Sequence, residues 1–285
     1  MGRCARIVRL GSPLPRTFDS AAGWIALLRE RGFRTAYWPL ADDAPSDEVD
    51  AYAAAAVEAG VSIAEIGAWQ ANPLSPDDAT RAAGLERCKA QLALADRVGA
   101  RCCVNIAGSR TGTWDGPHAD SLGADTFALI VDSVREILDA VAPARSYYTL
   151  EPMPYLLPDS PDRYLELLRA IDRPRFAVHL DPVNMINTPA KLYDNAGFLR
   201  ECFDKLGPYV RAVHAKDMTI TNALTLDMPE RRPGLGDIDF HAFIREMQRL
   251  DPDTPFLVEH LDSDEEYVAA VAHVRAVADE LGVAS

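Results

Sequence analysis

Three carboxylates and one imidazole end four successive short apolar runs in the second half of the chain. They are Glu151, Asp181, His214 and Glu259. If these runs are parallel strands of one barrel, their carboxyl ends meet at one rim, where catalytic groups of such barrels stand. Each carboxylate alone is explained by a helix cap or a solvated charge, and His214 alone by a hydrogen-bonded histidine of the barrel. Four such residues at the same position on four successive strands instead favour a shared site.

Three buried negative charges in one place are unfavourable unless a cation balances them. We therefore expect one divalent metal ion at this rim. One nitrogen and three oxygen donors suit Mn²⁺, Co²⁺ or Mg²⁺, whereas Zn²⁺ usually takes more nitrogen or sulfur and is the less favoured alternative.

Other polar side chains are expected beside this site. Side chains two residues apart in a strand share a face, so His179 should point with Asp181 and Lys216 with His214. Lys216 then holds a substrate oxygen or a phosphate, or pairs with a carboxylate such as Asp217 or Glu151. Asn105 ends the fourth strand and should reach a sugar hydroxyl from the same rim. His260 should face outward if the strand continues to it, and then has a structural role.

Two long loops after the fourth and seventh strands are expected to bind substrate, because long loops inside compact domains are commonly functional. They cover residues 108–118 and 217–238. The first contains Trp114 and His118, and a tryptophan there either stacks on a sugar face or packs on the surface.

Short apolar runs alternate with longer amphipathic ones along the whole chain, which is typical of a parallel sheet covered by helices. The expected strands are Ala5–Leu10, Thr35–Pro39, Val61–Ile66, Arg101–Ala107, Tyr147–Glu151, Phe176–Asp181, Val210–Ala215 and Phe256–His260. The expected helices lie near 19–31, 46–59, 76–98, 123–141, 161–171, 195–206, 239–250 and 264–281. Eight such units in 285 residues predict a single (β/α)8 TIM barrel domain over residues 1–285.

Helix starts carry local signals. Ser75-Pro76-Asp77-Asp78 should open the third helix with a cap and a proline at its first position, and Ser160-Pro161 should open the fifth in the same way. The turn after the first strand has no GxGxxG, and the sequence contains no GxSxG, P-loop, HExxH or CxxC motif.

Composition excludes several classes of partner. The chain has 29 basic and 43 acidic residues, a formal charge of −14, which argues against nucleic acid and against an anionic membrane surface. Five cysteines without paired metal spacing indicate free thiols in a reducing compartment. No apolar stretch approaches about 20 residues, so we expect a cytoplasmic protein. The sequence leaves homo-oligomer formation open.

The sequence resembles the sugar phosphate isomerase/epimerase superfamily, whose xylose-isomerase-like barrels include ketose 3-epimerases, inosose dehydratases and endonuclease IV. The resemblance covers nearly the whole chain in element order. It is carried by Leu150-Glu151-Pro152, by His179-Leu180-Asp181-Pro182-Val183-Asn184, by Val213-His214-Ala215-Lys216-Asp217, by residues 233–240 (PGLGDIDF) and by Val258-Glu259-His260.

This resemblance implies a role for each matching residue. In the epimerases, residues matching Glu151, Asp181, His214 and Glu259 hold one divalent metal, commonly manganese, and those matching Glu151 and Glu259 also move the proton. The implied reaction is proton abstraction alpha to the carbonyl of a sugar or sugar derivative, through a metal-stabilised enediolate. Ketose epimerases place substrate-contacting residues where this chain has Asn184, Leu157 and Ile220.

Three functions therefore stand at this stage. The first is a metal-dependent carbohydrate isomerase or epimerase. The second is a lyase or dehydratase that acts on a keto-sugar, keto-inositol or 3-keto-glycoside by the same enolisation, with His179, Lys216 or His118 as the acid. The third is sugar binding without catalysis. The candidate substrate-binding residues are Asn105, Trp114, His118, His179, Asn184 and Lys216.

Overall fold

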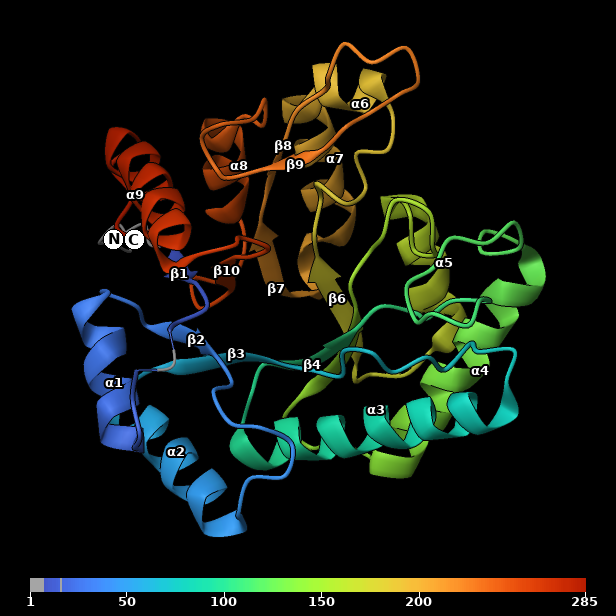
Figure 1. The fold of residues 1–285 in the computed structure, drawn as a ribbon, viewed down its shortest axis with the longest axis horizontal. Coiled ribbons are helices and arrows are strands. Elements are labelled where there is room, and N and C mark those ends of the chain that lie inside the picture. Colours follow the sequence, from blue (N-terminus) through green and yellow to red (C-terminus); the bar gives the residue numbers. More distant parts are fainter. Residues whose placement is uncertain (1–7, 16) are drawn as a thin grey trace.

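A computed structural model describes residues 8–15 and 17–285 and shows eight parallel strands that form a nearly closed barrel (Figure 1). The strands are β1 (Arg9–Gly11), β2 (Thr35–Tyr37), β3 (Ser62–Gly67), β4 (Cys102–Asn105), β5 (Tyr147–Leu150), β6 (Phe176–Leu180), β7 (Val210–Ala215) and β10 (Pro255–Val258). Their order in the sheet is β1-β10-β7-β6-β5-β4-β3-β2. At the seam, a Cβ on Gly11 would lie 2.9 Å from Thr35 O, so β1 and β2 lie side by side.

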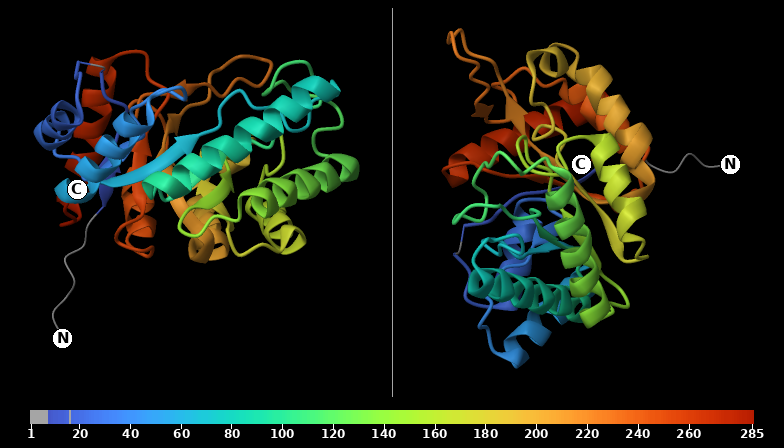
Figure 2. Two further views of the ribbon diagram at one scale, coloured as in Figure 1. Left: turned by 90° about the horizontal axis from the view of Figure 1, so that it is seen from below. Right: turned by 90° about the vertical axis from the view of Figure 1, so that its right-hand side faces the viewer.

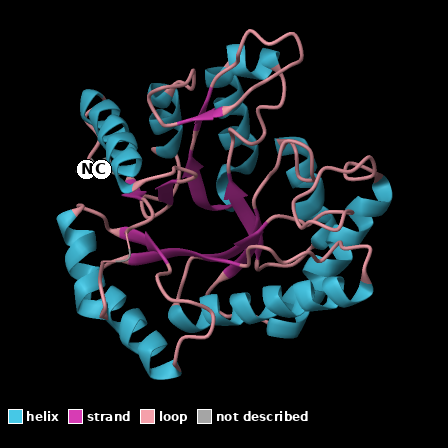
Figure 3. Cartoon of the chain, viewed as in Figure 1, coloured by secondary structure: helices cyan, strands magenta, loops and turns pink. Residues whose placement is uncertain are grey.

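Helices surround the strands on the outside, as Figure 3 shows. They are α1 (Ala21–Glu30), α2 (Ser46–Ala59), α3 (Asp78–Val98), α4 (Ala124–Val141), α5 (Pro161–Ile171), α6 (Pro189–Tyr193), α7 (Asn195–Leu206), α8 (Phe240–Met247) and α9 (Asp264–Glu280). Alternating strands and helices in this closed order confirm the predicted (β/α)8 TIM barrel.

Helix starts follow the local signals in one case and shift in the other. Ser160 caps α5 and Pro161 is its first residue, as expected. The third helix begins later than expected, because Asp77 is the residue whose side chain accepts the Thr80 N–H. Ser75 instead accepts the Asp77 N–H at 3.2 Å, which places Pro76 before the helix and corrects the expected cap.

Most expected strands are present but one to three residues shorter at their ends. The expectation for residues 5–7 lies outside the described residues. Elements that were not expected are α6, the 3-10 turn Gly207–Tyr209, and a short antiparallel pair of β8 (Asp217–Met218) with β9 (Glu230–Arg231). Within residues 8–15 and 17–285, no helix combines the length and apolar character needed to cross a membrane.

The two long loops lie at the same end of the barrel. Figure 2 shows the orange segment after β7 and the green segment after β4 projecting on one side, beyond the carboxyl ends of the strands. This is the rim at which the side chains expected to do chemistry should meet.

Candidate metal centre

Glu151, Asp181, His214 and Glu259 converge at the carboxyl ends of β5, β6, β7 and β10. Each offers a ligand atom within 4.8 Å of the ligand atoms of the others. His214 Nδ1 lies 2.9 Å from Glu259 Oε2, 3.2 Å from Glu151 Oε1 and 3.9 Å from Asp181 Oδ2. All four side chains are buried. The sheet order explains this, because these four strands are consecutive neighbours in the barrel.

A cavity of about 510 Å³ opens beside the quartet. Glu151 and Glu259 line it, whereas Asp181 and His214 do not. The remaining lining residues are Pro13, Tyr37, Glu65, Trp69, Gln70, Ile106, Trp114, Asp115, Met153, His260 and Tyr267. Among the described residues that line it there is neither arginine nor lysine. A ligand in this cavity therefore meets four carboxylates, those of Glu65, Asp115, Glu151 and Glu259, and several aromatic rings.

Lys216 enters the quartet from the carboxyl end of β7 and is itself buried. Its Nζ lies 2.7 Å from Glu259 Oε1 and 2.9 Å from Asp181 Oδ2, and it also lies 3.2 Å from Glu230 Oε1. Lys216 thus pairs with carboxylates, as one of the two interpretations expected, but not with the suggested Asp217 or Glu151. The side chain does point with His214, as strand alternation predicted, and its ammonium balances part of the carboxylate charge.

Burial and the neighbouring charges shift the ionisation of the quartet. Burial raises the pKa of Asp181 to about 6, against the opposing effect of the Lys216 ammonium. Burial also opposes the ionisation of Glu259, but His214 and Lys216 together hold its pKa well below the usual range. Burial lowers the pKa of His214, but the negative charges of Glu259 and Glu151 raise it by more. The net shift of the His214 pKa is therefore upward. Without a metal, the protein supplies positive charge to these carboxylates from His214 and Lys216.

The donor set fits a divalent cation. Ligand atoms about 2.0–2.4 Å from one ion lie no more than about 4.8 Å apart, which is the spread found among these four side chains. Asp181 Oδ2 and Glu259 Oε1 accept no hydrogen bond of good geometry from the described residues. Both face the Lys216 ammonium at ion-pair distance only. Buried carboxylate oxygens without donors are what a cation would satisfy.

Of the candidate substrate-binding residues, Trp114 lines this cavity, and Asn184 contacts the lining residue Glu151. Trp114 packs edge-on against Trp69, with ring centroids 6.2 Å apart. Asn184 Nδ2 donates to Glu151 Oε1 and to Pro152 O, both at 3.1 Å, and its Oδ1 accepts from Lys216 Nζ at 3.0 Å. The Asn184 amide therefore holds Glu151 and Lys216 in place.

The structure places Asn105, His118 and His179 away from the cavity lining. Asn105 is fully buried and donates to Ala71 O at 3.2 Å, in the wall of the barrel. His118 is exposed, and its Nδ1 accepts the Asp120 N–H at 3.1 Å. His179 points into the barrel, as expected, where its Nε2 lies 2.7 Å from Glu65 Oε2 and its ring contacts that of His214.

Glu65 and His260 are the residues that sequence reasoning missed. Glu65 is a buried acid on β3 whose carboxylate contacts His179 at 2.7 Å. A single acid inside an apolar strand was the available signal. His260 lines the cavity, although it was expected to face outward if the strand continued to it. The strand ends at Val258 and His260 has a φ of 55°, so strand alternation does not reach it.

Asp217 anchors the loop that follows β7. Its carboxylate accepts backbone N–H groups from Met218 at 2.8 Å, Gly234 and Gly236 at 3.0 Å, and Ile238 at 3.1 Å. A Cβ on Gly236 would lie 2.1 Å from Asp217 Oδ1, so glycine is required for this approach. The motif at residues 233–240 thus closes the loop onto the strand that carries His214 and Lys216.

Comparison with known proteins gives a family match over most of the chain. The family model for xylose isomerase-like TIM barrels matches residues 25–277. Among curated proteins, none matches this sequence.

Solved structures with the same barrel are similar over nearly their whole length. Endonuclease IV from Thermus thermophilus superposes with a TM-score of 0.72 at 16% identity, covering 96% of this chain and 99% of that one. An L-ribulose 3-epimerase gives 0.69 at 18%, covering 98% and 95%. A xylose isomerase-like protein from Mycobacterium smegmatis in complex with magnesium gives 0.66 at 17%, covering 98% and 97%.

Proposed function

The chain belongs to the xylose isomerase-like TIM barrel family, and on that premise we propose that it is a divalent-metal-dependent isomerase or epimerase of a sugar or sugar derivative. The observation that carries this proposal is the position of Glu151 and Glu259. They come from β5 and β10, which flank the adjacent pair β6 and β7 in the sheet, and both line the cavity.

Two carboxylates on either side of a bound substrate can divide the work of moving one proton. One removes the proton alpha to a carbonyl. The other returns a proton to the opposite face of the same carbon, which inverts it; if the proton instead goes to the former carbonyl carbon, and a proton moves from the neighbouring hydroxyl to the carbonyl oxygen, the carbonyl changes place. A divalent ion held by the quartet, with Mn²⁺ the first expectation, would supply Lewis-acid stabilisation of the developing oxyanion. Asn184 orients Glu151 through its amide, and Lys216 and His214 keep Glu259 ionised.

The cavity favours a small neutral carbohydrate as the substrate. Its described lining has carboxylates but neither arginine nor lysine, so an anionic phosphate or nucleic acid would meet repulsion there. Trp69 and Trp114 offer ring faces and edges of the kind on which the apolar side of a sugar packs. The formal charge of −14 also disfavours nucleic acid, although endonuclease IV shares the fold.

A second candidate is a lyase that begins with the same enolisation and then loses a beta substituent. Two positions favour this shift of chemistry. Asn184 uses its amide on Glu151, Pro152 and Lys216, and Leu157 is buried in the core. Neither position therefore offers the substrate contact that ketose epimerases have there, so the substrate must be oriented by other groups.

The test is hydrogen exchange at the alpha carbon in D₂O. Purified protein loaded with Mn²⁺ is incubated with ketoses and with 3-keto-glycosides, and deuterium uptake is followed by NMR. Glu151→Gln and Glu259→Gln should lower the exchange rate by about 10²–10⁴-fold. The control Glu201→Gln changes a carboxylate that pairs with Lys205 on the surface of α7 and should leave the rate unchanged.

Product mass separates the two candidates, because isomerisation leaves the mass unchanged and elimination lowers it. Metal content is measured for each variant, since both glutamates are also expected metal ligands. If the wild-type protein binds metal and exchanges no hydrogen with any of these substrates, the enolisation proposal is refuted.

A further inference from the structure

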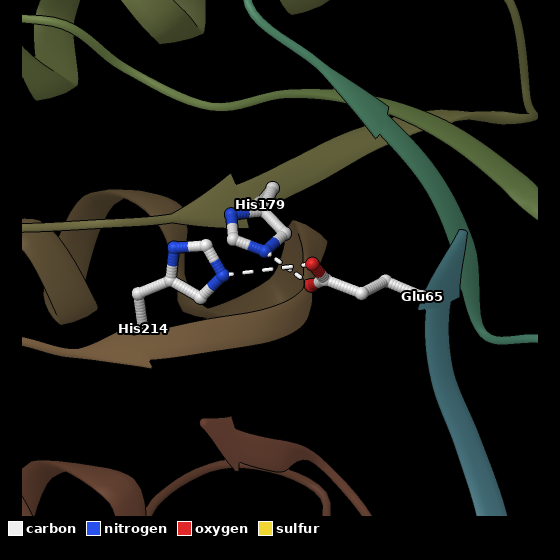
Figure 4. Close-up of side chains that lie close together, drawn as sticks. All are labelled: Glu65, His179 and His214. Carbon is white, nitrogen blue, oxygen red and sulfur yellow. Dashed lines mark hydrogen bonds and ion pairs between the residues drawn. The ribbon is translucent and has the colours of Figure 1, made fainter. Parts of the chain in front are cut away.

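Glu65 is an acidic side chain in the middle of the apolar strand β3, where it is only 2% exposed. A carboxylate at this depth is stable only if neighbouring groups donate hydrogen bonds to it or balance its charge. Its neighbours are two imidazoles, His179 from β6 and His214 from β7. Figure 4 shows the Glu65 side chain extending from β3 across to both rings.

Glu65, His179 and His214 form a compact unit that shares His214 with the quartet. His179 Nε2 lies 2.7 Å from Glu65 Oε2, and His214 Nε2 lies 3.6 Å from Glu65 Oε1. The two imidazole rings meet edge to face, with centroids 4.1 Å apart and planes at 73°. Because His179 Nε2 can bond Glu65 only as a donor, His179 fixes one carboxylate oxygen and leaves the other aimed at His214.

His214 has two distinct ring nitrogens, and the structure gives them different neighbours. Nδ1 faces Glu151 and Glu259, among the other donors of the quartet, so it is the nitrogen placed to ligate a cation. A ligating nitrogen carries no proton, and the neutral ring then carries its proton on Nε2. That proton points toward Glu65.

The Nε2 of His214 and the Oε1 of Glu65 have no hydrogen-bond partner among the described residues. They face each other across 3.6 Å. If the distance between these two atoms decreases by about 0.7 Å, it reaches ordinary hydrogen-bond length. An unpaired buried donor thus lies opposite an unpaired buried acceptor, in the arrangement by which carboxylates orient metal-bound histidines.

We propose that Glu65 is a positioning residue for the metal centre. Its carboxylate accepts the Nε2 proton of His214 and so holds the ring in the tautomer and orientation that present Nδ1 to the cation. His179 holds Glu65 in turn. This inference rests on the metal centre of the proposed function but not on the reaction catalysed there.

The test measures metal binding without any substrate. Glu65→Gln keeps the shape of the side chain but removes its charge and one acceptor oxygen. We expect Mn²⁺ affinity, measured by calorimetry on the metal-free protein, to fall by about 10–100-fold. The visible spectrum of the Co²⁺-loaded variant should differ from that of the wild type, because the orientation and basicity of the His214 ligand change.

A control variant changes a similarly buried carboxylate elsewhere. Glu246→Gln on α8 removes a carboxylate that is 9% exposed and pairs with Arg249. Its Mn²⁺ affinity and Co²⁺ spectrum should match those of the wild type.

A pair of variants at His179 keeps the inference testable if Glu65→Gln does not fold. His179→Gln retains an N–H donor for Glu65 and should bind Mn²⁺ more tightly than His179→Leu, which retains none.

The outcomes separate this inference from the proposed function. Unchanged affinity and spectrum in Glu65→Gln overturn the positioning role, even if the wild type is an active isomerase. Binding of two ions per chain also overturns it, because the trio would then be a second metal site. A wild-type protein that binds no divalent ion overturns both the inference and the metal-dependent function, whereas metal binding without hydrogen exchange overturns the function alone.

Discussion

Replacing Lys216 by methionine should make the stability of the protein depend on metal. The ammonium of Lys216 lies 2.7 Å from Glu259 and 2.9 Å from Asp181, and the lysine is 2% exposed. Methionine has a similar length and no charge. The variant therefore leaves two buried carboxylates facing each other with one cation fewer.

The magnitude follows from the two ion pairs. At an effective dielectric constant of about 20, unit charges about 2.8 Å apart attract each other by about 6 kcal/mol per pair. Desolvation of the three groups offsets much of this attraction. Removal of one partner from a buried pair typically lowers the free energy of unfolding by about 3–5 kcal/mol. We expect a loss of that size in the metal-free protein.

A bound divalent ion should restore the missing positive charge. Ligand present at about 100 times its dissociation constant stabilises a protein by about 2.7 kcal/mol. The gain should be larger in Lys216→Met, because the ammonium no longer competes with the ion for Asp181 and Glu259. Urea unfolding in EDTA and in excess Mn²⁺ measures both losses, and the loss with Mn²⁺ should be less than half of the loss in EDTA.

The control is Lys205→Met, which removes a surface lysine that also bridges two carboxylates, Asp162 and Glu201, each at 2.7 Å. Exposed pairs of this kind contribute at most about 1 kcal/mol each. Its loss should be small and equal in EDTA and in Mn²⁺. If Lys216→Met loses the same free energy in both solutions, the quartet does not share its charge between lysine and metal, and the reasoning fails.

Three further outcomes are expected. Asp217→Ala leaves the backbone N–H groups of Gly234, Gly236 and Ile238 without their acceptor, so amide exchange followed by mass spectrometry should accelerate there and not in α2; equal protection in variant and wild type would contradict the anchoring role. Burial raises the pKa of Cys88 to about 11 and also raises the pKa values of Cys102, Cys103 and Cys202, so these thiols are protonated at pH 8 and react only as the pH rises toward their raised pKa values or after unfolding. In a Cys4→Ser background, a disulfide reagent at pH 8 should therefore titrate the native protein negligibly and label the remaining thiols in urea, whereas fast native labelling would show that the thiols are accessible. Leu92→Ala, at a fully buried position of α3, should lower the free energy of unfolding by about 2–5 kcal/mol, and a loss below about 1 kcal/mol in urea titration would mean that the cavity collapses.

The fold could be predicted from the sequence because its signals are local. Helices α2, α5 and α7 occupy the expected residues, since caps, glycines and apolar periodicity lie within each segment. The predicted ends of the strands were less accurate, because a strand ends where its hydrogen bonds to neighbouring strands end, and those strands lie elsewhere in the chain. The short α6 and the β8–β9 pair lie inside loops and lack an apolar repeat long enough to detect.

The quartet could be predicted because each of its members lies at the carboxyl end of a strand. The remaining contacts depend on distances across the barrel interior. Glu65 meets His179 from a position 114 residues away in the chain, and no local pattern pairs them. Asn105 was assigned to the rim because it ends the fourth strand, but its amide instead donates to Ala71 O in the barrel wall. The sequence suggested Asp217 and Glu151 as partners of Lys216. Its side chain instead extends to Asp181 and Glu259, which follow β6 and β10.

The Asp217 carboxylate accepts hydrogen bonds from both ends of the loop between β7 and α8. The tip of that loop, residues 222–226, is exposed throughout and includes the fully exposed Leu224. It therefore does not stabilise the wall of the barrel. Insertions, deletions or substitutions at the tip would leave His214 and Lys216 undisturbed. Evolution, or a protein engineer, could therefore diversify this surface while keeping the chemistry constant.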